Sequence, residues 1–310
     1  MVWSTTRGND YLMRVGYDKL GRRKQSSLGP RSEKTEATKA EFERKREEAQ
    51  KSLATIQDTM LRQSAVNRAL GLGRVPLLSA KIIRAIDGAG LMGAGVRVLG
   101  THALYAYEAA AGVHVESGLT TTGDVDLLLD ARKRLSFVAS SEMEELSILK
   151  LLRRIDKSFV RTEQSFRATN DEGYLVDLIK PLRDPPWTEE ASSVGNDPDD
   201  LTAVEIAGLA WHESAPKFEA IAIDERGFPL RIATSDPRVF AAHKLWVSQR
   251  GDRDPVKKVR DRQQAECVAS LVTTHLPHLP FSEEDLRMLP KDVVERAKPL
   301  FENNSATPGP

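Results

Sequence analysis

The sequence predicts an α+β protein whose central mixed sheet is flanked by helices. Three observations lead to this class: helix and strand patterns alternate from residue 77 to 180, one long helical pattern precedes them, and three helical patterns follow them. A chain of 310 residues is longer than one ordinary domain. We therefore expect three parts, at residues 1–75, 76–182 and 183–310.

Composition narrows the class of protein. Apolar residues make up 40% of the chain and charged residues 29%, which is the balance of a globular protein in water. No segment approaches the roughly 18–20 uncharged apolar residues of a membrane helix, and the first residues lack a signal-peptide pattern. We expect a cytoplasmic protein that does not enter a membrane. Cys267 is the only cysteine, so it forms no internal disulfide, and inert packing is a better expectation for it than a nucleophilic role.

Charge is distributed unevenly along the chain. The formal net charge is zero, yet residues 1–75 contain 16 Lys and Arg against nine Asp and Glu. A basic arm on a neutral protein is typical of a polyanionic partner such as RNA. A solvated surface is the alternative.

The N-terminal part begins with a predicted β-hairpin. Tyr11, Met13, Val15 and Tyr17 alternate along a strand that leads into a turn at residues 18–21. Five basic side chains of this hairpin could contact a phosphate backbone, or belong to an ordinary basic surface: Arg14, Lys19, Arg22, Arg23 and Lys24.

A long amphipathic helix is predicted over about residues 35–70, and the glycine- and proline-containing residues 71–76 end it. We expect its apolar stripe to pack on a domain or on a second copy of the chain rather than to bind a cofactor. The stripe consists of Phe42, Ala49, Leu53, Ile56 and Met60.

Elements alternate beyond this helix. The patterns predict helices at 77–87, 101–111 and 141–155, strands at 96–99, 124–129, near 158–167 and 173–179, a strand pair near 217–232, and helices at about 236–250, 255–274 and 282–301.

The predicted strand at residues 124–129 carries the pattern most informative about chemistry. Alternation along a strand places Asp124 and Asp126 on the same face. Two neighbouring carboxylates repel each other unless a cation lies between them, so this pair is suited to a divalent metal ion. Chance occurrence on an exposed strand is the alternative.

Gly100 and Thr101 form the second pattern, where the buried strand at 96–99 turns into a helix. Glycine allows a phosphate to approach closely, Thr101 would supply a hydroxyl and the N-cap, and a helix N-terminus favours negative charge. A plain turn and cap is the simpler interpretation.

Asp177 is the third pattern, as the one acidic residue in the apolar strand at 173–179. A buried unpaired carboxylate is costly, but Asp177 could join the other two around metal ions and accept a proton from an attacking hydroxyl. A salt bridge to Arg161, Arg167 or Lys180 is the structural alternative.

Taken in order, these patterns resemble the DNA polymerase beta-like nucleotidyltransferase superfamily, in which Gly-Gly or Gly-Ser begins a helix, an acidic-hydrophobic-acidic strand follows, and a third acidic residue comes later. Thr101 replaces the usual serine, and the 22 residues between Thr101 and Asp124 are more than the family usually has, so we expect an added loop beside the site. The fuller string at residues 100–108 and 122–126 is more similar to a bacterial subgroup of nucleotidyltransferase-fold proteins, and this similarity extends over most of the chain.

The resemblance implies a nucleotidyltransferase fold and the transfer of a nucleoside monophosphate from a nucleoside triphosphate, such as ATP, to a hydroxyl of RNA, a protein or a small molecule. It implies Mg²⁺ or Mn²⁺ as cofactor at Asp124, Asp126 and Asp177, and phosphate binding by Gly100 and Thr101. His102 could touch phosphate or acceptor, although a packed histidine is the better expectation.

Lys244 and Arg250 are candidate counter-charges for the triphosphate on the predicted helix at 236–250. Their pattern loosely resembles the abortive-infection toxin branch of the superfamily, and a solvated basic helix is the alternative. Two other functions stay open: a non-catalytic nucleotide- or nucleic-acid-binding module, and a toxin-type nucleotidyltransferase in phage defence. Nucleotide, acceptor and oligomeric state do not follow from the sequence.

Overall fold

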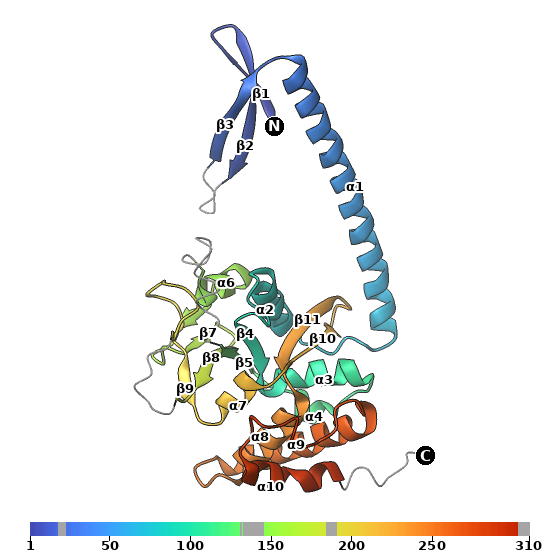
Figure 1. Ribbon diagram of the computed structural model, residues 1–310, viewed down its shortest axis with the longest axis vertical. Coiled ribbons are helices and arrows are strands. Elements are labelled where there is room, and N and C mark those ends of the chain that lie inside the picture. The colour runs from blue at the N-terminus through green and yellow to red at the C-terminus, as the bar shows by residue number, and fades with distance from the viewer. Residues whose placement is uncertain (18–22, 131, 133–145, 184–190, 303–310) are drawn as a thin grey trace. The chain divides into compact units, whose positions relative to one another are not determined.

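A computed structural model describes residues 1–17, 23–130, 132, 146–183 and 191–302. The chain divides into two compact units, Met1–Val66 and Asn67–Pro310, and each contains a β-sheet (Figure 1). The boundary lies inside one helix, α1, which spans Glu33–Ala69. The domain boundaries predicted at residues 76 and 182 stay predictions.

The first unit contains a three-stranded antiparallel sheet in the order β1-β2-β3, with β1 at Val2–Thr6, β2 at Asn9–Tyr17 and β3 at Arg23–Pro30. The β2-β3 pair confirms the predicted hairpin, whose turn lies outside the described residues. Strand β1 was not predicted, although its Val, Trp and Thr residues favour extended backbone.

Helix α1 confirms the predicted long helix. Ser32 and Thr35 cap its start, each accepting a hydrogen bond from the other's backbone N–H. Leu53 and Ile56 of the predicted stripe are each 55% exposed. The described residues of α1 are instead linked by ion pairs four residues apart, such as Lys39 with Glu43, and each such pair contributes only a few tenths of a kcal/mol, about 0.2–0.5. A covering partner for the stripe stays a prediction.

The second unit comprises the remaining elements, in chain order: α2 Leu77–Gly88, β4 Val96–Leu99, η1 Gly100–Ala103, α3 Leu104–Ala111, α4 Ser117–Thr120, β5 Asp124–Leu129, α6 Ile148–Ile155, β6 Val160–Arg161, β7 Arg167–Thr169, β8 Leu175–Pro181, β9 Val204–Ile206, α7 Leu209–Ser214, β10 Lys217–Ile223, β11 Pro229–Ser235, α8 Pro237–Gln249, α9 Pro255–His275 and α10 Lys291–Glu302.

A mixed sheet organises this unit and confirms the predicted α+β class. Its strand order is β4-β5-β8-β7-β6, and β9 pairs with the far end of β8. Strand β5 is antiparallel to β4 and parallel to β8. Strands β5 and β8 are therefore hydrogen-bonded to a neighbouring strand on each side. They carry all three predicted carboxylates.

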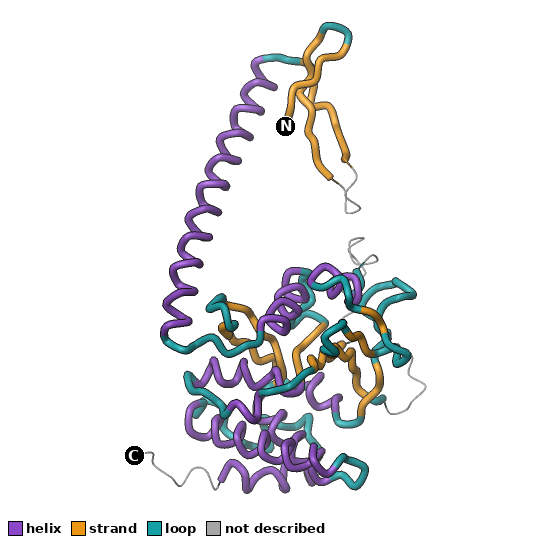
Figure 2. Tube along the Cα trace, turned by 180° about the vertical axis from the view of Figure 1, so that it is seen from behind, coloured by secondary structure: helices purple, strands orange, loops and turns teal. Residues whose placement is uncertain are grey.

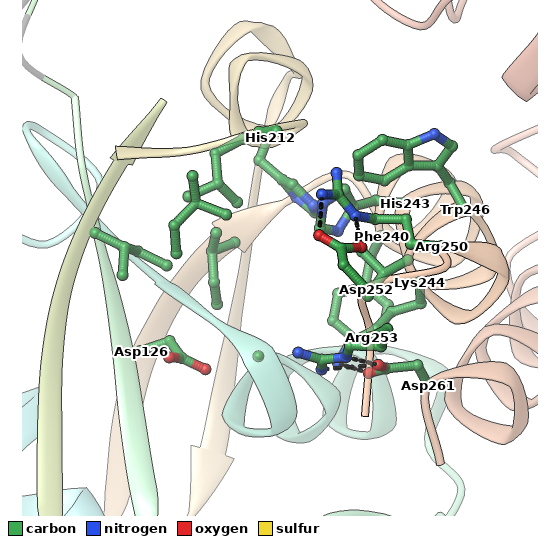
Figure 3. Close-up of a pocket in the computed structure, with 17 residues that line it drawn as sticks. Asp126, His212, Phe240, His243, Lys244, Trp246, Arg250, Asp252, Arg253 and Asp261 are labelled. Carbon is green, nitrogen blue, oxygen red and sulfur yellow. Dashed lines mark hydrogen bonds and ion pairs between the residues drawn. The ribbon is translucent and has the colours of Figure 1, made fainter. Parts of the chain in front are cut away.

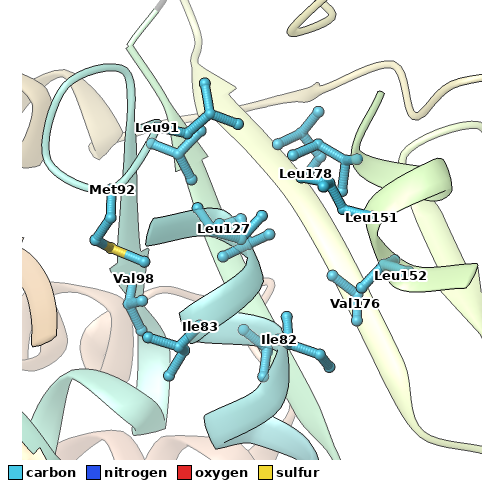
Figure 4. Packing of buried hydrophobic residues seen from close by; sticks show 14 of the residues in the cluster. Ile82, Ile83, Leu91, Met92, Val98, Leu127, Leu151, Leu152, Val176 and Leu178 are labelled. Carbon is cyan, nitrogen blue, oxygen red and sulfur yellow. The ribbon is translucent and has the colours of Figure 1, made fainter. Parts of the chain in front are cut away.

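One face of the sheet is covered by α2 and α6. Ile82 and Ile83 of α2 and Leu152 of α6 pack with Leu127 of β5 and Leu178 of β8, and all five are fully buried (Figure 4). Burying one such side chain contributes roughly 1.5–3 kcal/mol. This layer covers one face of the sheet and leaves the opposite face of β5 for other contacts.

The opposite face is turned toward α7 and the C-terminal helices. Leu128 of β5 and Ile179 of β8 pack with Leu209 of α7. Helices α8, α9 and α10 form their own apolar clusters next to this face, so the strands lie between α2 and α6 on one side and α8 to α10 on the other (Figures 1 and 2).

Several predicted boundaries differ from the structure. The predicted helix at 101–111 begins as a 3-10 turn, η1. The helix predicted at 141–155 begins at Ile148, after the N-cap Ser147, and residues 141–145 lie outside the described part. The last helix begins at Lys291 rather than 282. Short elements β9 and α7 were not predicted. No helix in the described ranges is long and apolar enough to cross a membrane.

Candidate nucleotide-binding site

The two aspartates of β5 lie on the same face of the sheet, as the alternation predicts. Val125 and Leu127 are buried on the face covered by α2 and α6, whereas Asp124 and Asp126 are only partly buried. Asp124 accepts a hydrogen bond from the Thr122 hydroxyl at the start of the strand. The strand therefore presents two carboxylates, two residues apart, toward the side of the C-terminal helices.

Asp177 lies directly beside Asp126. Strands β5 and β8 are parallel, and their register pairs Asp126 with Asp177. Neighbouring strands are about 4.8 Å apart, so the third predicted carboxylate joins the first two through the sheet pairing alone. The structure thus brings together Asp124, Asp126 and Asp177.

Gly100 touches Asp126 from the other neighbouring strand. The register of β4 with β5 pairs Leu99 with Asp126, and Gly100 follows with a left-handed backbone, φ +59°. A Cβ atom at this position would lie 2.0 Å from Asp126 Oδ2. Only glycine satisfies both the backbone conformation and the contact.

Thr101 does not have the predicted role of N-cap. Leu99 occupies that position, and no side chain caps the turn. The Thr101 hydroxyl instead accepts a hydrogen bond of 3.2 Å from Gln264 Nε2 on α9. Because the chain tightens into a 3-10 turn at Gly100, the threonine lies inside the turn and contacts α9.

The surroundings of Asp126 oppose its ionisation. Burial, followed by the negative charge of Asp124, raises the pKa of the Asp126 carboxyl to about 6. Asp177 acts in the same direction, whereas Lys244 and Arg167 act against it. A carboxylate crowded by like charges is stabilised by a cation placed against it.

Asp177 is already neutralised by an arginine. Arg167 on β7 donates from Nε to Asp177 Oδ1 at 2.7 Å and from Nη2 to Oδ2 at 2.6 Å. This two-bond pair is the salt bridge that the sequence offered as the structural alternative for Asp177. The sequence did not distinguish Arg167 from the two other candidate partners, Arg161 and Lys180.

The carboxylates of β5 fit a divalent cation better than the full set of three does. Mg²⁺ is commonly held by one or two carboxylates together with substrate phosphates, and Asp124 and Asp126 supply such a pair of hard oxygen ligands. Asp177 is engaged by Arg167, and the described residues contain no cluster of three or more His, Cys, Asp or Glu arranged to hold a metal.

A pocket of about 340 Å³ opens beside Asp126. Its walls come from the end of β4, from β5, β8 and β9, and from α7, α8 and the start of α9 (Figure 3). It contains four of the seven predicted site residues: Gly100, Asp126, Lys244 and Arg250. Asp124, Asp177 and Thr101 lie next to it rather than on its walls.

Cations face Asp126 across this pocket. Lys244 of α8 and Arg253, just before α9, both pair with the buried Asp261: the Lys244 Nζ to Oδ1 and Arg253 Nη2 to Oδ2 distances are each 2.7 Å. Asp261 holds the two cations together (Figure 3). Lys244 is therefore not the freely solvated lysine that the alternative interpretation expected.

Arg250 extends this cationic wall at the end of α8. It pairs with Asp252 at 2.6 Å, and its guanidinium lies over the Trp246 ring, 4.8 Å from the centroid. Trp246 and the guanidinium both line the pocket (Figure 3), which adds a flat surface next to the charges.

Sequence reasoning did not assign pocket roles to Arg253, Asp261, His243 or Trp246. The sequence contains part of the information needed to find them, since Arg253 and Asp261 belong to the run of basic and acidic residues that follows Arg250. Which of these charges turn inward depends on the angle between α8 and α9. Burial, with the nearby Lys244 charge, lowers the pKa of His243 to about 3, so this imidazole is neutral.

His102 is a packed residue under the site. Only 1% of it is exposed, and its Nε2 lies 2.8 Å from the Ser79 hydroxyl, which in turn lies 2.8 Å from the Tyr174 hydroxyl. Burial lowers the pKa of His102 to about 4. This agrees with the packed histidine favoured by the sequence.

The added length between Thr101 and Asp124 is partly structured. It includes α4, which α9 holds through Gln264 Nε2, bonded to the Leu119 carbonyl at 2.9 Å, and through Arg260, bonded to the Thr121 carbonyl. The segment thus links the strand that carries the aspartates to the C-terminal helices.

The second unit thus combines a mixed sheet with adjacent carboxylates on its central strands, a glycine turn against one of them, and cations on the facing wall of the pocket. Comparison with known proteins identifies the class: a family described as Nucleotidyltransferase matches residues 78–289. The chain belongs to this nucleotidyltransferase family and is a transferase. No curated protein and no solved structure matches it.

Proposed function

We propose that this chain is a polymerase beta-like nucleotidyltransferase that moves a nucleoside monophosphate from a nucleoside triphosphate to a hydroxyl acceptor. The carrying observation is that Asp126 and the cations Lys244, Arg250 and Arg253 line one pocket. A triphosphate needs both features, because its charge must be balanced while its α-phosphate is presented to an attacking hydroxyl.

The cationic wall would bind the β- and γ-phosphates. Lys244 and Arg253 now share one carboxylate, Asp261, and Arg253 offers the planar donors that match phosphate oxygens. Gly100, whose missing Cβ leaves room for Asp126 Oδ2, would place that carboxylate beside the phosphates, and Thr101 lies on the same turn. These contacts would stabilise the pyrophosphate as it leaves.

Asp124 and Asp126 would hold Mg²⁺ or Mn²⁺, which would supply charge neutralisation at the reacting phosphate. The acceptor oxygen would form the new bond to the α-phosphorus, and the bond from that phosphorus to the β-phosphate oxygen would break. Asp177 would take the acceptor's proton, since each carboxylate oxygen has a second lone pair beside the one that Arg167 uses.

The first unit would bind a polyanionic acceptor such as RNA. Arg14 of β2 and Arg23 and Lys24 of β3 are exposed, and strand backbones bearing exposed cations can follow a phosphate chain. This partner is independent of the chemistry at Asp126.

The test is transfer of label from each of four α-labelled nucleoside triphosphates, with Mg²⁺ or Mn²⁺, to total RNA and to lysate proteins. We expect the intact chain to label an acceptor and Asp126→Asn to lose about 100-fold of the rate or more, because the carboxylate that would hold the cation loses its charge. Asp171→Asn, an exposed aspartate outside the site, is the matched control and should retain full transfer.

Measuring nucleotide affinity distinguishes an enzyme from a non-catalytic nucleotide-binding module. If no nucleotide labels any acceptor, and Asp126→Asn binds nucleotides as tightly as the intact chain, the chain is a non-catalytic module. Label transferred equally by the intact chain and by Asp126→Asn would place the chemistry elsewhere.

A further inference from the structure

Arg167 stands inside the carboxylate cluster rather than beside it. Strand β7 is antiparallel to β8, and the register pairs Arg167 with Asp177, while Asp177 is paired on its other side with Asp126. Arg167, Asp177 and Asp126 therefore form one row across three adjacent strands. The row is built by sheet pairing, so its members cannot separate without breaking the sheet.

The guanidinium is held in one orientation. Its two bonds to Asp177, 2.7 and 2.6 Å, have the fork geometry in which both carboxylate oxygens are used. The neighbouring Phe166 ring lies against it, 5.4 Å from the guanidinium carbon to the centroid. About 30% of the arginine side chain is exposed, so its charge is only partly screened by water.

The charge of Arg167 lies in the same row as Asp126, and Asp124 precedes Asp126 by two residues on β5. The described residues offer the Asp126 carboxylate no hydrogen-bond donor. Asp124 and Asp126 are thus left for an added cation, whereas Asp177 is already paired with the cationic side chain of Arg167.

We infer that Arg167 is a positioning residue that takes the place of a second divalent cation, so that the free protein binds one metal ion, at Asp124 and Asp126. The inference rests on the proposed function and deepens it. In two-metal sites the ions lie about 3.5–4 Å apart and share carboxylate ligands. Here an arginine, which stays protonated at all working pH values, neutralises the carboxylate that a second ion would need.

The test counts Mn²⁺ ions bound per chain by titration calorimetry in the absence of nucleotide. We expect one ion for the intact chain and two for Arg167→Gln, because the glutamine amide keeps hydrogen bonding but removes the charge from Asp177. Arg167→Lys keeps the charge and should stay at one ion. The double variant Arg167→Gln/Asp177→Asn removes the freed carboxylate and should return to one.

Arg161→Gln is the matched control, since Arg161 lies on the neighbouring strand β6 and bonds only to backbone carbonyls in the described structure. Two ions on the intact chain, or one ion on Arg167→Gln with its fold intact by circular dichroism, would overturn the inference. Either result would leave the proposed function standing if label transfer depends on Asp126. No ion on the intact chain, together with no label transfer, would overturn both.

Discussion

Gly100 and Asp126 depend on each other for their positions in the candidate site. The glycine backbone is in the left-handed region, and its missing Cβ leaves the space that Asp126 Oδ2 fills. The aspartate is held there by the pairing of β4 with β5. A Cβ atom at residue 100 would therefore disturb both the backbone conformation and the Asp126 carboxylate.

Gly100→Ala should lose both stability and nucleotidyl transfer. A left-handed alanine costs roughly 1–3 kcal/mol, and its Cβ would push the Asp126 carboxylate away. Gly112→Ala is the matched control, because φ is +69° there with no atom within 4 Å of the added Cβ. Urea unfolding should show a loss in both variants, and labelled-nucleotide assays a loss in Gly100→Ala alone. Full transfer by Gly100→Ala would show that Asp126 is not needed in this position.

His102 should make stability depend on pH. Its folded pKa of about 4 lies below the usual value of 6.5, so the stability from its neutral form is complete above about pH 6.5 and is lost as the pH falls toward 4. Urea unfolding at pH 7 and pH 4.5 should show a smaller loss for His102→Gln than for the intact chain. An equal loss in the two proteins would assign the pH dependence to other groups.

At the scale of elements, helices α8 and α9 and their connection bring Lys244, Arg250 and Arg253 to the pocket beside Asp126. Each begins with an aspartate cap followed by proline: Asp236 accepts from Arg238 N, and Asp254 from Val256 N and Lys257 N. The short connection between the helices contains Arg253 and Asp252. The caps therefore mark where the two helices begin, and Arg253 directly precedes the second cap.

Asp254→Ala should lower the free energy of unfolding by about 0.5–2 kcal/mol, because two backbone N–H groups lose their acceptor. Asp254→Asn retains a side-chain oxygen and should lose far less. Urea unfolding measures both. Nucleotide affinity should fall in the alanine variant if the start of α9 positions Arg253 and Asp261, and unchanged stability in that variant would contradict the capping role.

At the scale of the whole molecule, the chain joins a small basic unit to a unit that contains the entire candidate site. Gly100, the three aspartates, Lys244 and Arg250 all lie in Asn67–Pro310, and the three-stranded sheet with its exposed cations lies in Met1–Val66. This division predicts that acceptor binding and nucleotide binding can be altered separately.

Reversing charge at Arg14, Arg23 and Lys24 should weaken RNA binding and leave nucleotide binding unchanged. If each side chain contacts one phosphate, the slope of log affinity against log salt should become shallower by about 2, at roughly 0.7 per contact on single strands. Fluorescence anisotropy with labelled single-stranded RNA over a salt series measures the slope. An intact chain whose RNA affinity does not respond to salt would contradict a role for this surface.

Local patterns in the sequence were sufficient for the class of fold and for the acidic strands. Asp124 and Asp126 share a face because strand side chains alternate. The apolar run around Asp177 predicts a strand without showing which strand will be its neighbour. Strand β5 begins and ends where the pattern predicts. These features depend only on residues that are close together in the sequence, so they can be predicted from the sequence alone.

Only the tertiary structure decided which residues meet. The pairing of β7 with β8 selected Arg167 from three candidate partners of Asp177, the 3-10 turn moved Thr101 from a cap to a contact with Gln264, and the approach of α8 and α9 gave Lys244 and Arg253 a shared carboxylate. Strand order and helix crossing angles result from packing the whole core. A sequence pattern records which side of an element is apolar, but not which partner will cover it.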